Sequence, residues 1–301
     1  MPIRPIAPWK LRTRTLELGR RTLVMGVVNI TPDSFSDGGH YLNPQAAIAH
    51  ALQLLDEGAD LLDLGAESTR PGTQSGPAPA VSAGEEQARL LPVLKGILKA
   101  HPKAILSVDT YKAATARAAL AAGAEIVNDV SGLFWDSEMA SACAQAACGV
   151  ILMHTRGLPN EWATQPQLTP DALLGIVQSG LHASLIKAAT AGIASESVVL
   201  DPGYGFGKRG QENFVLLSRQ QELLALGRPL LAGLSRKSFL GKALAPLHQG
   251  SPAAVESRET ASLAALVAAI LNGASIVRVH QVRPAVEAAL IADAIAAEAK
   301  P

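Results

Sequence analysis

The chain has 301 residues, of which 48% are hydrophobic, and it carries 26 acidic and 26 basic side chains. This apolar content is enough for a large core and excludes a disordered chain. The balanced charge argues against proteins that bind nucleic acid or membrane surfaces, which normally show a basic excess. The N-terminal sequence MPIRPIAPWK lacks the apolar stretch of a secretory signal, so we expect a cytoplasmic protein.

The first predicted element is the segment 11–19, whose sequence LRTRTLELG alternates polar and apolar residues. Alternation is typical of a strand with one face in water, so we expect a strand or hairpin outside the main sheet. A different pattern begins at residue 22. Helical stretches rich in alanine and leucine end at a glycine, and a short aliphatic run follows at once, as at Gly58, Gly123, Gly149 and Gly273. Glycine just past a helix end can adopt the left-handed conformation that closes the last turn.

The aliphatic runs do not alternate, which is typical of strands buried on both faces of a parallel sheet. Eight runs are present, at 22–30, 61–66, 104–109, 126–130, 150–154, 197–201, 229–234 and 276–280. A helical stretch follows each run, near 44–57, 84–100, 111–122, 137–147, 170–191, 211–226, 253–272 and 284–299. Eight successive β/α units predict an α/β protein with a closed (β/α)8 TIM barrel. We expect one domain spanning 1–301, with residues 1–20 as an extension that covers the barrel.

Two of the predicted strands lead into long polar loops. The sequence TPDSFSDGG at 31–39 follows the first strand, and RPGTQSGPAPAVSAG at 70–84 follows the second. Both are rich in glycine, proline and hydroxyl side chains, which form loops rather than regular elements. We interpret the first loop, with Phe35 as its one aromatic residue, as a mobile lid over an active site.

Some features could indicate other classes of protein. The run 261–277 is the most apolar of the chain, but it is shorter than a membrane span and is interrupted by polar Asn272, so we expect a buried helix and then a strand. Cys143 and Cys148 have no histidine nearby, so they form no zinc motif and should be buried, reduced thiols. His154 has no second ligand at helical spacing that would indicate a metal site.

Every predicted strand ends in, or leads into, polar or charged residues. In a TIM barrel the active site lies at the C-terminal ends of the strands, so these side chains should meet there. In chain order they are Asn29; Asp63, Glu67, Ser68, Thr69 and Arg70; Asp109; Asn128 and Asp129; His154; Asp201; Ser235, Arg236 and Lys237; Arg278 and His280.

The chemistry of this set indicates its ligand. The middle strands supply hydrogen-bond acceptors that suit a planar ring with several N–H groups, namely Asp109, Asn128 and Asp201. The second loop and the last two strands supply cations, namely Arg70, Lys237, Arg278 and His280. Strands 7 and 8 are where this fold often binds phosphate. The sequence therefore predicts an N–H-rich heterocycle that carries a phosphate or diphosphate.

Eight short segments, one at each strand end, carry a family resemblance. They are MGVVNITPDSFSDGG, ESTRPG, SVDTYK, VNDVSG, MHTRG, DPGYGFGK, GLSRKSFLG and RVH. In this order they resemble the dihydropteroate synthase family along the barrel, from about residue 22 to 295. The chain departs from the usual family pattern at Ala66 and at Gln281, neither of which we assign to chemistry.

The resemblance implies a reaction in which the amine of p-aminobenzoate displaces diphosphate from 6-hydroxymethyl-7,8-dihydropterin diphosphate, giving 7,8-dihydropteroate. It implies pterin contacts from Asp109, Asn128, Met153, Asp201, Phe206 and Lys237. It implies diphosphate contacts from Asn29, Arg70, Arg278 and His280, and p-aminobenzoate contacts from Thr69, Pro71, Phe206, Ser235 and Lys237. Phe35 and Asp37 are implied to close over the site, and Asn29 and Asp37 to hold Mg²⁺.

The resemblance also implies a homodimer and sulfonamides as inhibitors. The apolar run 261–272 favours a dimer independently, because it exceeds what a helix on a barrel surface needs. Two alternatives share the barrel. A methyltransferase that moves a methyl group from a folate to a corrinoid would need neither STRPG, SRK nor the Arg278 and His280 pair. A non-catalytic pterin-binding paralogue would lose the polar loops, which this chain keeps.

Overall fold

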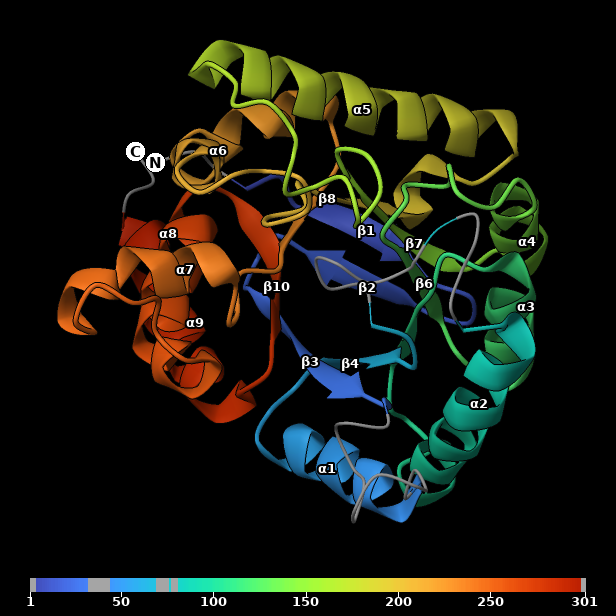
Figure 1. Cartoon of the computed structure of the whole chain (residues 1–301). Helices are drawn as coiled ribbons and strands as arrows, with labels where there is room; N and C mark the ends of the chain where they lie inside the picture. The colour runs from blue at the N-terminus through green and yellow to red at the C-terminus, as the bar shows by residue number, and fades with distance from the viewer. Residues whose placement is uncertain (1–3, 32–43, 69–75, 77–80, 299–301) are drawn as a thin grey trace.

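A closed barrel of eight parallel strands forms the centre of the computed structural model (Figure 1). The structure describes residues 4–31, 44–68, 76 and 81–298. The barrel strands are β3 (Leu23–Asn29), β4 (Leu61–Gly65), β5 (Leu106–Asp109), β6 (Ile126–Asp129), β7 (Gly149–Met153), β8 (Val198–Asp201), β9 (Leu230–Ala232) and β10 (Ala274–Val279). They follow one another in chain order, and β10 pairs with β3 to close the sheet. The predicted (β/α)8 barrel is confirmed.

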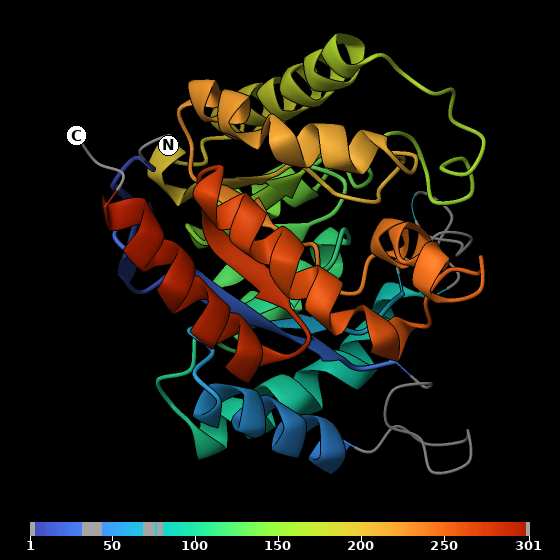
Figure 2. The ribbon, with the colours of Figure 1, turned by 90° about the vertical axis from the view of Figure 1, so that its left-hand side faces the viewer.

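Helices surround the barrel and cover the outer face of the sheet (Figures 1 and 2). They are α1 (Pro44–Asp56), α2 (Ala83–Ala100), α3 (Ala113–Ala121), α4 (Met139–Ala146), α5 (Pro170–Thr190), α6 (Glu212–Ser218), α7 (Ser238–Ala243), α8 (Glu259–Leu271) and α9 (Val282–Glu298). Short 3-10 segments are Ser195–Ser197, Gln220–Leu226, Ala245–Leu247 and Val255–Arg258. The run 261–277 forms most of α8 and most of β10, so the expected helix and strand are confirmed.

The seventh β/α unit differs from the prediction of one helix over 253–272. Helix α8 begins only at Glu259, and the short helix α7 precedes it. Arg258 explains the late start, because its Nε donates to the carbonyl of Ala253 at 2.9 Å and its NH1 to that of Arg236 at 3.0 Å. These bonds tether the residues before α8 to the loop after β9 instead of letting them continue as helix.

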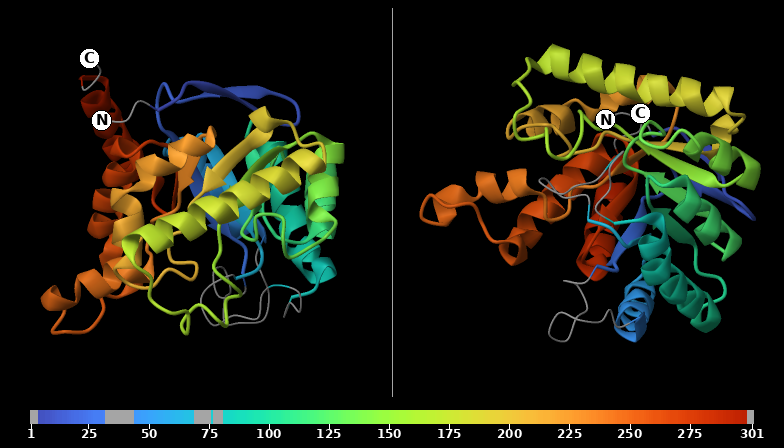
Figure 3. Two further views of the ribbon diagram at one scale, coloured as in Figure 1. Left: turned by 90° about the horizontal axis from the view of Figure 1, so that it is seen from above. Right: turned by 45° about the vertical axis from the view of Figure 1, so that its right-hand side comes forward.

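A two-stranded hairpin covers the N-terminal end of the barrel, as Figure 3 shows in blue. Its strands are β1 (Ala7–Lys10) and β2 (Thr15–Leu18), which pair antiparallel. Trp9 and Leu18 are fully buried against the first interior layer of the barrel, and the Trp9 indole donates to the carbonyl of Ser197 at 2.9 Å. The predicted hairpin is confirmed, although β1 lies before the segment 11–19 on which the prediction rested.

The cap glycines are confirmed at three of the four predicted positions. Gly58, Gly123 and Gly273 have positive φ values, but Gly149 does not, and Ala147 takes the left-handed position after α4. The prediction for Gly149 was therefore wrong. A Cβ at Gly149 would lie 2.5 Å from the Leu11 side chain and 3.4 Å from the Trp9 ring, so a larger residue would have to displace the hairpin side chains that pack against β7.

One helix among the described residues, α5, is long and apolar enough to cross a membrane by length and composition alone. One side of α5 is buried, through Leu173, Val177 and Leu181, and packs in the ring beside α4, α6 and β7. The helix thus serves as a covering element of the barrel. Both cysteines are buried free thiols, as expected.

Candidate active site

The parallel register brings the predicted polar residues together at the C-terminal end of the barrel. Asp109 ends β5 and pairs in register with Asn128 of β6. Met153 ends β7 and pairs with Asp201, the last residue of β8. Because parallel strands all end at the same mouth, side chains from distant parts of the chain become neighbours there.

An ion-paired cluster forms the floor of this mouth. The Arg278 guanidinium donates from Nε to Asp63 Oδ2 at 2.6 Å and from NH2 to Asp109 Oδ2 at 2.7 Å. The Asn128 amide also donates to Asp63 Oδ2, at 2.9 Å. Sequence reasoning placed Asp63 near the site but gave it no role. A carboxylate inside the otherwise aliphatic strand LLDLG was the available signal.

Burial changes the acidity of the groups in the mouth. It raises the pKa of Asp109 to about 7, with the charge of Arg278 opposing and that of Asp63 reinforcing the shift. It also raises the pKa of Asp201, against the Gly203 N–H and nearby cations. Burial lowers the pKa of Lys237 to about 8. Such shifts are typical of functional sites, where charges are held out of water until a ligand pairs with them.

An apolar wall stands beside the acceptors. Met153 packs with Tyr111 and Val130, and Phe206 lies against this cluster. The Lys237 ammonium lies 4.0 Å from the centroid of the Phe206 ring, within the range of a cation–π contact. Met153, Phe206 and Lys237 are the residues expected at the pterin face and beside p-aminobenzoate. The structure places them next to one another.

The ends of the last two strands are joined by a side-chain contact. Ser235 Oγ lies 2.9 Å from His280 Nδ1 and accepts the backbone N–H of His280 at 3.3 Å. Ser235 is buried. This contact orients the His280 ring at the position where the sequence predicted an anion site.

The loop after β8 depends on close backbone approach. Gly203 has φ +70°, and a Cβ there would lie 2.0 Å from the carbonyl oxygen of His154. Its N–H donates to Asp201 Oδ1 at 2.7 Å, which fixes the carboxylate. The buried Lys208 ammonium donates to the His154 carbonyl at 2.7 Å, so the loops after β7 and β8 are held together.

Two residues of the strand-end set have structural roles. Asp129 accepts the backbone N–H groups of Ser131 and Leu133, both at 2.8 Å, and so closes its own turn. The His154 ring packs against α5, where a Cβ at Gly180 would lie 2.4 Å away, and burial lowers its pKa well below the ordinary value.

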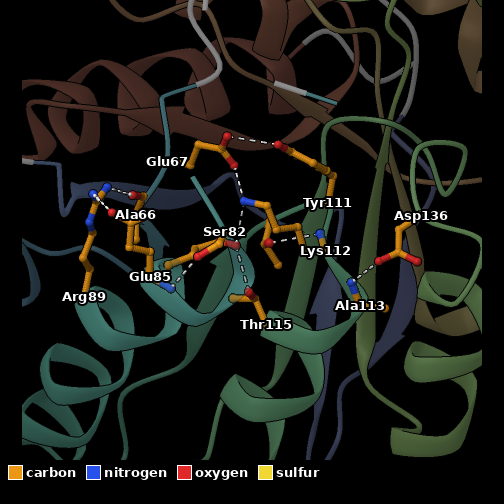
Figure 4. A network of polar contacts seen from close by, with 12 residues as sticks. Ala66, Glu67, Ser82, Glu85, Arg89, Tyr111, Lys112, Ala113, Thr115 and Asp136 are labelled. Atoms are coloured by element: carbon orange, nitrogen blue, oxygen red, sulfur yellow. Dashed lines mark hydrogen bonds and ion pairs between the residues drawn. The ribbon is translucent and has the colours of Figure 1, made fainter. Parts of the chain in front are cut away.

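A buried polar network joins the residues that follow β4 to α2 and to the start of α3 (Figure 4). The Lys112 ammonium pairs with Glu67 and, at 3.1 Å, with Glu86, and the Tyr111 hydroxyl donates to Glu67 at 3.0 Å. Thr115 donates to Glu86 at 2.8 Å. The network therefore fixes Glu67, the residue that directly precedes the motif STRPG in the sequence. The motifs ESTRPG and SVDTYK contain Glu67, Tyr111 and Lys112, yet sequence reasoning gave them no role.

Comparisons with known proteins match the same part of the chain. A model of the pterin binding enzyme family matches residues 25–280. The dihydropteroate synthase of Synechocystis sp. is 41% identical over 278 residues, which are 92% of this chain and 91% of that protein.

Solved structures agree. The dihydropteroate synthase of Xanthomonas albilineans in complex with 7,8-dihydropteroate is 37% identical, with a TM-score of 0.81 over 98% of this chain and 100% of that chain. A Yersinia pestis dihydropteroate synthase with a sulfonamide drug complex is 38% identical, with a TM-score of 0.85 over 97% and 99%. The chain belongs to the dihydropteroate synthase family.

Several residues that the family resemblance implicates lie outside the described residues. They are Phe35, Asp37, Thr69, Arg70 and Pro71. Their expected contacts with diphosphate, Mg²⁺ and p-aminobenzoate stay predictions. The family residues that are described, from Asn29 to His280, all come from strand ends or the loops that directly follow them.

Asn29 is the expected Mg²⁺ ligand that lies among the described residues. No group of three His, Cys, Asp or Glu side chains in this part of the chain is placed to hold a metal. Asn29 ends β3 and is half-buried, so it offers one amide oxygen at the mouth. Mg²⁺ often binds through one or two protein oxygens together with substrate phosphates. The single oxygen of Asn29 fits that mode, and Asp37, the second expected ligand, lies outside the described residues.

Proposed function

We propose that the chain condenses p-aminobenzoate with 6-hydroxymethyl-7,8-dihydropterin diphosphate to give 7,8-dihydropteroate and diphosphate. The observation that carries this proposal is the set of acceptors Asp109, Asn128 and Asp201 beside the Lys237 ammonium in one barrel mouth. Such a set complements the alternating N–H and carbonyl groups of a pterin edge. Met153 and Phe206 supply an apolar surface for the ring faces.

The residues of the mouth would act mainly by binding and orientation. Asp201 and Asn128 accept pterin N–H groups, and Lys237 donates to the pterin carbonyl and ring nitrogen. The bond between the pterin methylene and diphosphate then breaks as the arylamine attacks, and His280 and Arg278 stabilise the charge that builds on the leaving group. A bound Mg²⁺, held by Asn29, would neutralise part of that charge. An arylamine attacking a cation-like methylene needs little help from a base, and the described mouth offers no dedicated one.

Turnover by the purified protein tests this function directly. We expect dihydropteroate to form from the pterin diphosphate and p-aminobenzoate, and formation to fall when Mg²⁺ is removed with a chelator. A protein that binds the pterin but never forms product would instead support the non-catalytic paralogue. Methyl transfer from a methyl-folate to a corrinoid would support the methyltransferase.

We predict an order of binding. Among the residues expected to contact p-aminobenzoate, Phe206 and Ser235 stand on the barrel, whereas Thr69 and Pro71 belong to a loop rich in glycine and proline. We therefore expect p-aminobenzoate to bind poorly until diphosphate and Mg²⁺ are present. Calorimetric titration with and without diphosphate checks this, and equal arylamine affinity in both would contradict it.

We predict a homodimer that uses the face of α9. The sequence assigned this role to 261–272, but α8 buries Ala265, Leu266, Ala269 and Ile270 in the core. The neighbouring helix α9 packs against α8 (Figure 2). It exposes Leu290 by 63% and Ile291 by 65%. Apolar patches of this kind often mark protein contacts.

Sedimentation at micromolar concentration checks the dimer. We expect about twice the monomer mass of 31.2 kDa, and a monomer for the variant L290E/I291E. Ile186 on α5 is 56% exposed and offers a matched control, because I186E should leave the mass unchanged. A monomeric parent protein would remove the prediction.

The free state of both cysteines agrees with the proposed cytoplasmic location, since cytosolic thiols are kept reduced.

A further inference from the structure

Asp63 lies beneath the candidate site and contacts two of the residues assigned to ligand binding. It is fully buried on β4, with Ser107 of β5 beside it in register. Its Oδ2 accepts both the Arg278 Nε–H at 2.6 Å and the Asn128 amide N–H at 2.9 Å. Its Oδ1 is buried and has no hydrogen-bond partner among the described residues. The binding roles proposed above make no use of this carboxylate.

The contact with Asp63 decides which way the Asn128 amide points. An ionised carboxylate can only accept hydrogen bonds, so the NH2 group of Asn128 must face it. The amide oxygen is then directed away from Asp63, and Asn128 presents an acceptor to a ligand. A neutral amide at position 63 would remove this constraint, because it can pair with Asn128 in either orientation.

Asp63 constrains Arg278 in the same way. The guanidinium is planar and uses Nε for Asp63 and NH2 for Asp109, which fixes its plane across the floor of the mouth. Its third nitrogen, NH1, makes no hydrogen bond to any residue that the structure describes, which leaves it as the donor for a ligand oxygen.

We propose that Asp63 is a positioning residue that gives the pterin pocket its selectivity for N–H-rich edges. It does so by holding the Asn128 amide with its oxygen toward the ligand and by fixing the plane of Arg278. The inference rests on the proposed function, because the ligand it concerns is the pterin diphosphate. Asp63 itself acts through its two neighbours.

The variant Asp63→Asn tests this role by calorimetric titration with the pterin diphosphate. We expect affinity to fall by about tenfold or more, since a charge-assisted bond is lost and the Asn128 oxygen is no longer held in place. Ser107→Ala is the matched control. Ser107 is equally buried next to Asp63, its hydroxyl has no partner within the described chain, and we expect its loss to leave affinity unchanged.

The pH dependence of binding separates positioning by charge from loss of structure. Asp109 faces the cations Arg278 and Lys237 and the carboxylates Asp63 and Glu86, and its pKa is about 7. Without the negative charge at position 63, Asp109 loses a repelling carboxylate and becomes the only carboxylate paired with Arg278 among the described residues. The pKa of Asp109 should therefore fall. The acid limb of pterin binding should then move to lower pH in Asp63→Asn. A loosened structure would weaken binding without moving the limb in that direction.

The exchanged pair Asp63→Asn with Asn128→Asp completes the test. The amide at 63 now donates to a carboxylate at 128, whose second oxygen again faces the ligand. We expect this variant to recover part of the affinity that Asp63→Asn loses, and we expect it to be folded because the donor and acceptor remain matched. Affinity no better than in Asp63→Asn, or an Asp63→Asn protein that binds normally with an unshifted limb, would overturn the inference. A parent protein that fails to bind the pterin diphosphate would overturn the proposed function as well.

Discussion

Asp201→Asn is expected to weaken binding of the pterin diphosphate by roughly a hundredfold. Asp201 ends β8, and its Oδ1 already accepts the Gly203 N–H at 2.7 Å. An asparagine would keep its oxygen on Gly203 and turn its NH2 toward the ligand. One charge-assisted bond is then lost and a donor meets a donor in a closed pocket, which costs about 3 kcal/mol.

Calorimetry with two ligands checks the assignment of Asp201. Free diphosphate contacts only the cationic side, so its affinity should stay within a few-fold of the parent value. Because burial raises the pKa of Asp201, binding to the parent protein should also weaken as the pH falls through that pKa, whereas the variant should keep only the acid dependence that comes from Asp109. Equal losses for pterin and diphosphate, or no loss at all, would show that Asp201 does not hold the ring.

Lys112→Met is expected to lower the free energy of unfolding by about 3 to 5 kcal/mol. The ammonium is buried between Glu67 and Glu86, whose side chains are 5% and 1% exposed. Removing it leaves two carboxylates next to each other without a counter-charge. Tyr111 and Thr115 donate to these carboxylates but cannot neutralise them.

Denaturant unfolding of the parent protein, Lys112→Met and Lys10→Met measures the change in the free energy of unfolding. Lys10→Met is the matched control, because Lys10 pairs with Glu196 at 2.8 Å on the surface, with side chains 53% and 38% exposed. Exposed pairs contribute less than about 1 kcal/mol, so this control should resemble the parent. A Lys112→Met protein within 1 kcal/mol of the parent would mean that the network in Figure 4 contributes little to the stability of the fold.

The barrel could be predicted from the sequence because each β/α unit carries its own local signal. The run that became β7 is short, aliphatic and unbroken, and the cap glycine Gly58 marks the helix end before β4. The hairpin strand β1 could not be predicted, since APWK has neither a clear alternation nor a turn signal. The packing of Trp9 beneath the barrel, a tertiary effect, determines its conformation.

The candidate site was predictable in its composition and not in its pairing. Asp109, Asn128, Asp201 and Arg278 could be predicted as site residues because they stand at strand ends, and all strand ends of this fold meet at one mouth. A strand buried on both faces, however, does not reveal which residues point inward, so Asp63 had no predicted role. Its partner Arg278 lies 215 residues away, and only closure of the barrel brings the two together.

Pairing of β10 with β3 has a consequence for how the protein is made. The ribosome releases β3 to β9 before β10, and during that time the carboxylates of Asp63 and Asp109 have no Arg278 to pair with. Arg4 likewise has no Asp293 to pair with until α9 has been synthesised. The last β/α unit therefore supplies both the final strand of the sheet and the counter-charge of the pocket. A chain that terminates before β10 lacks both, so it can neither close the barrel nor complete the pocket.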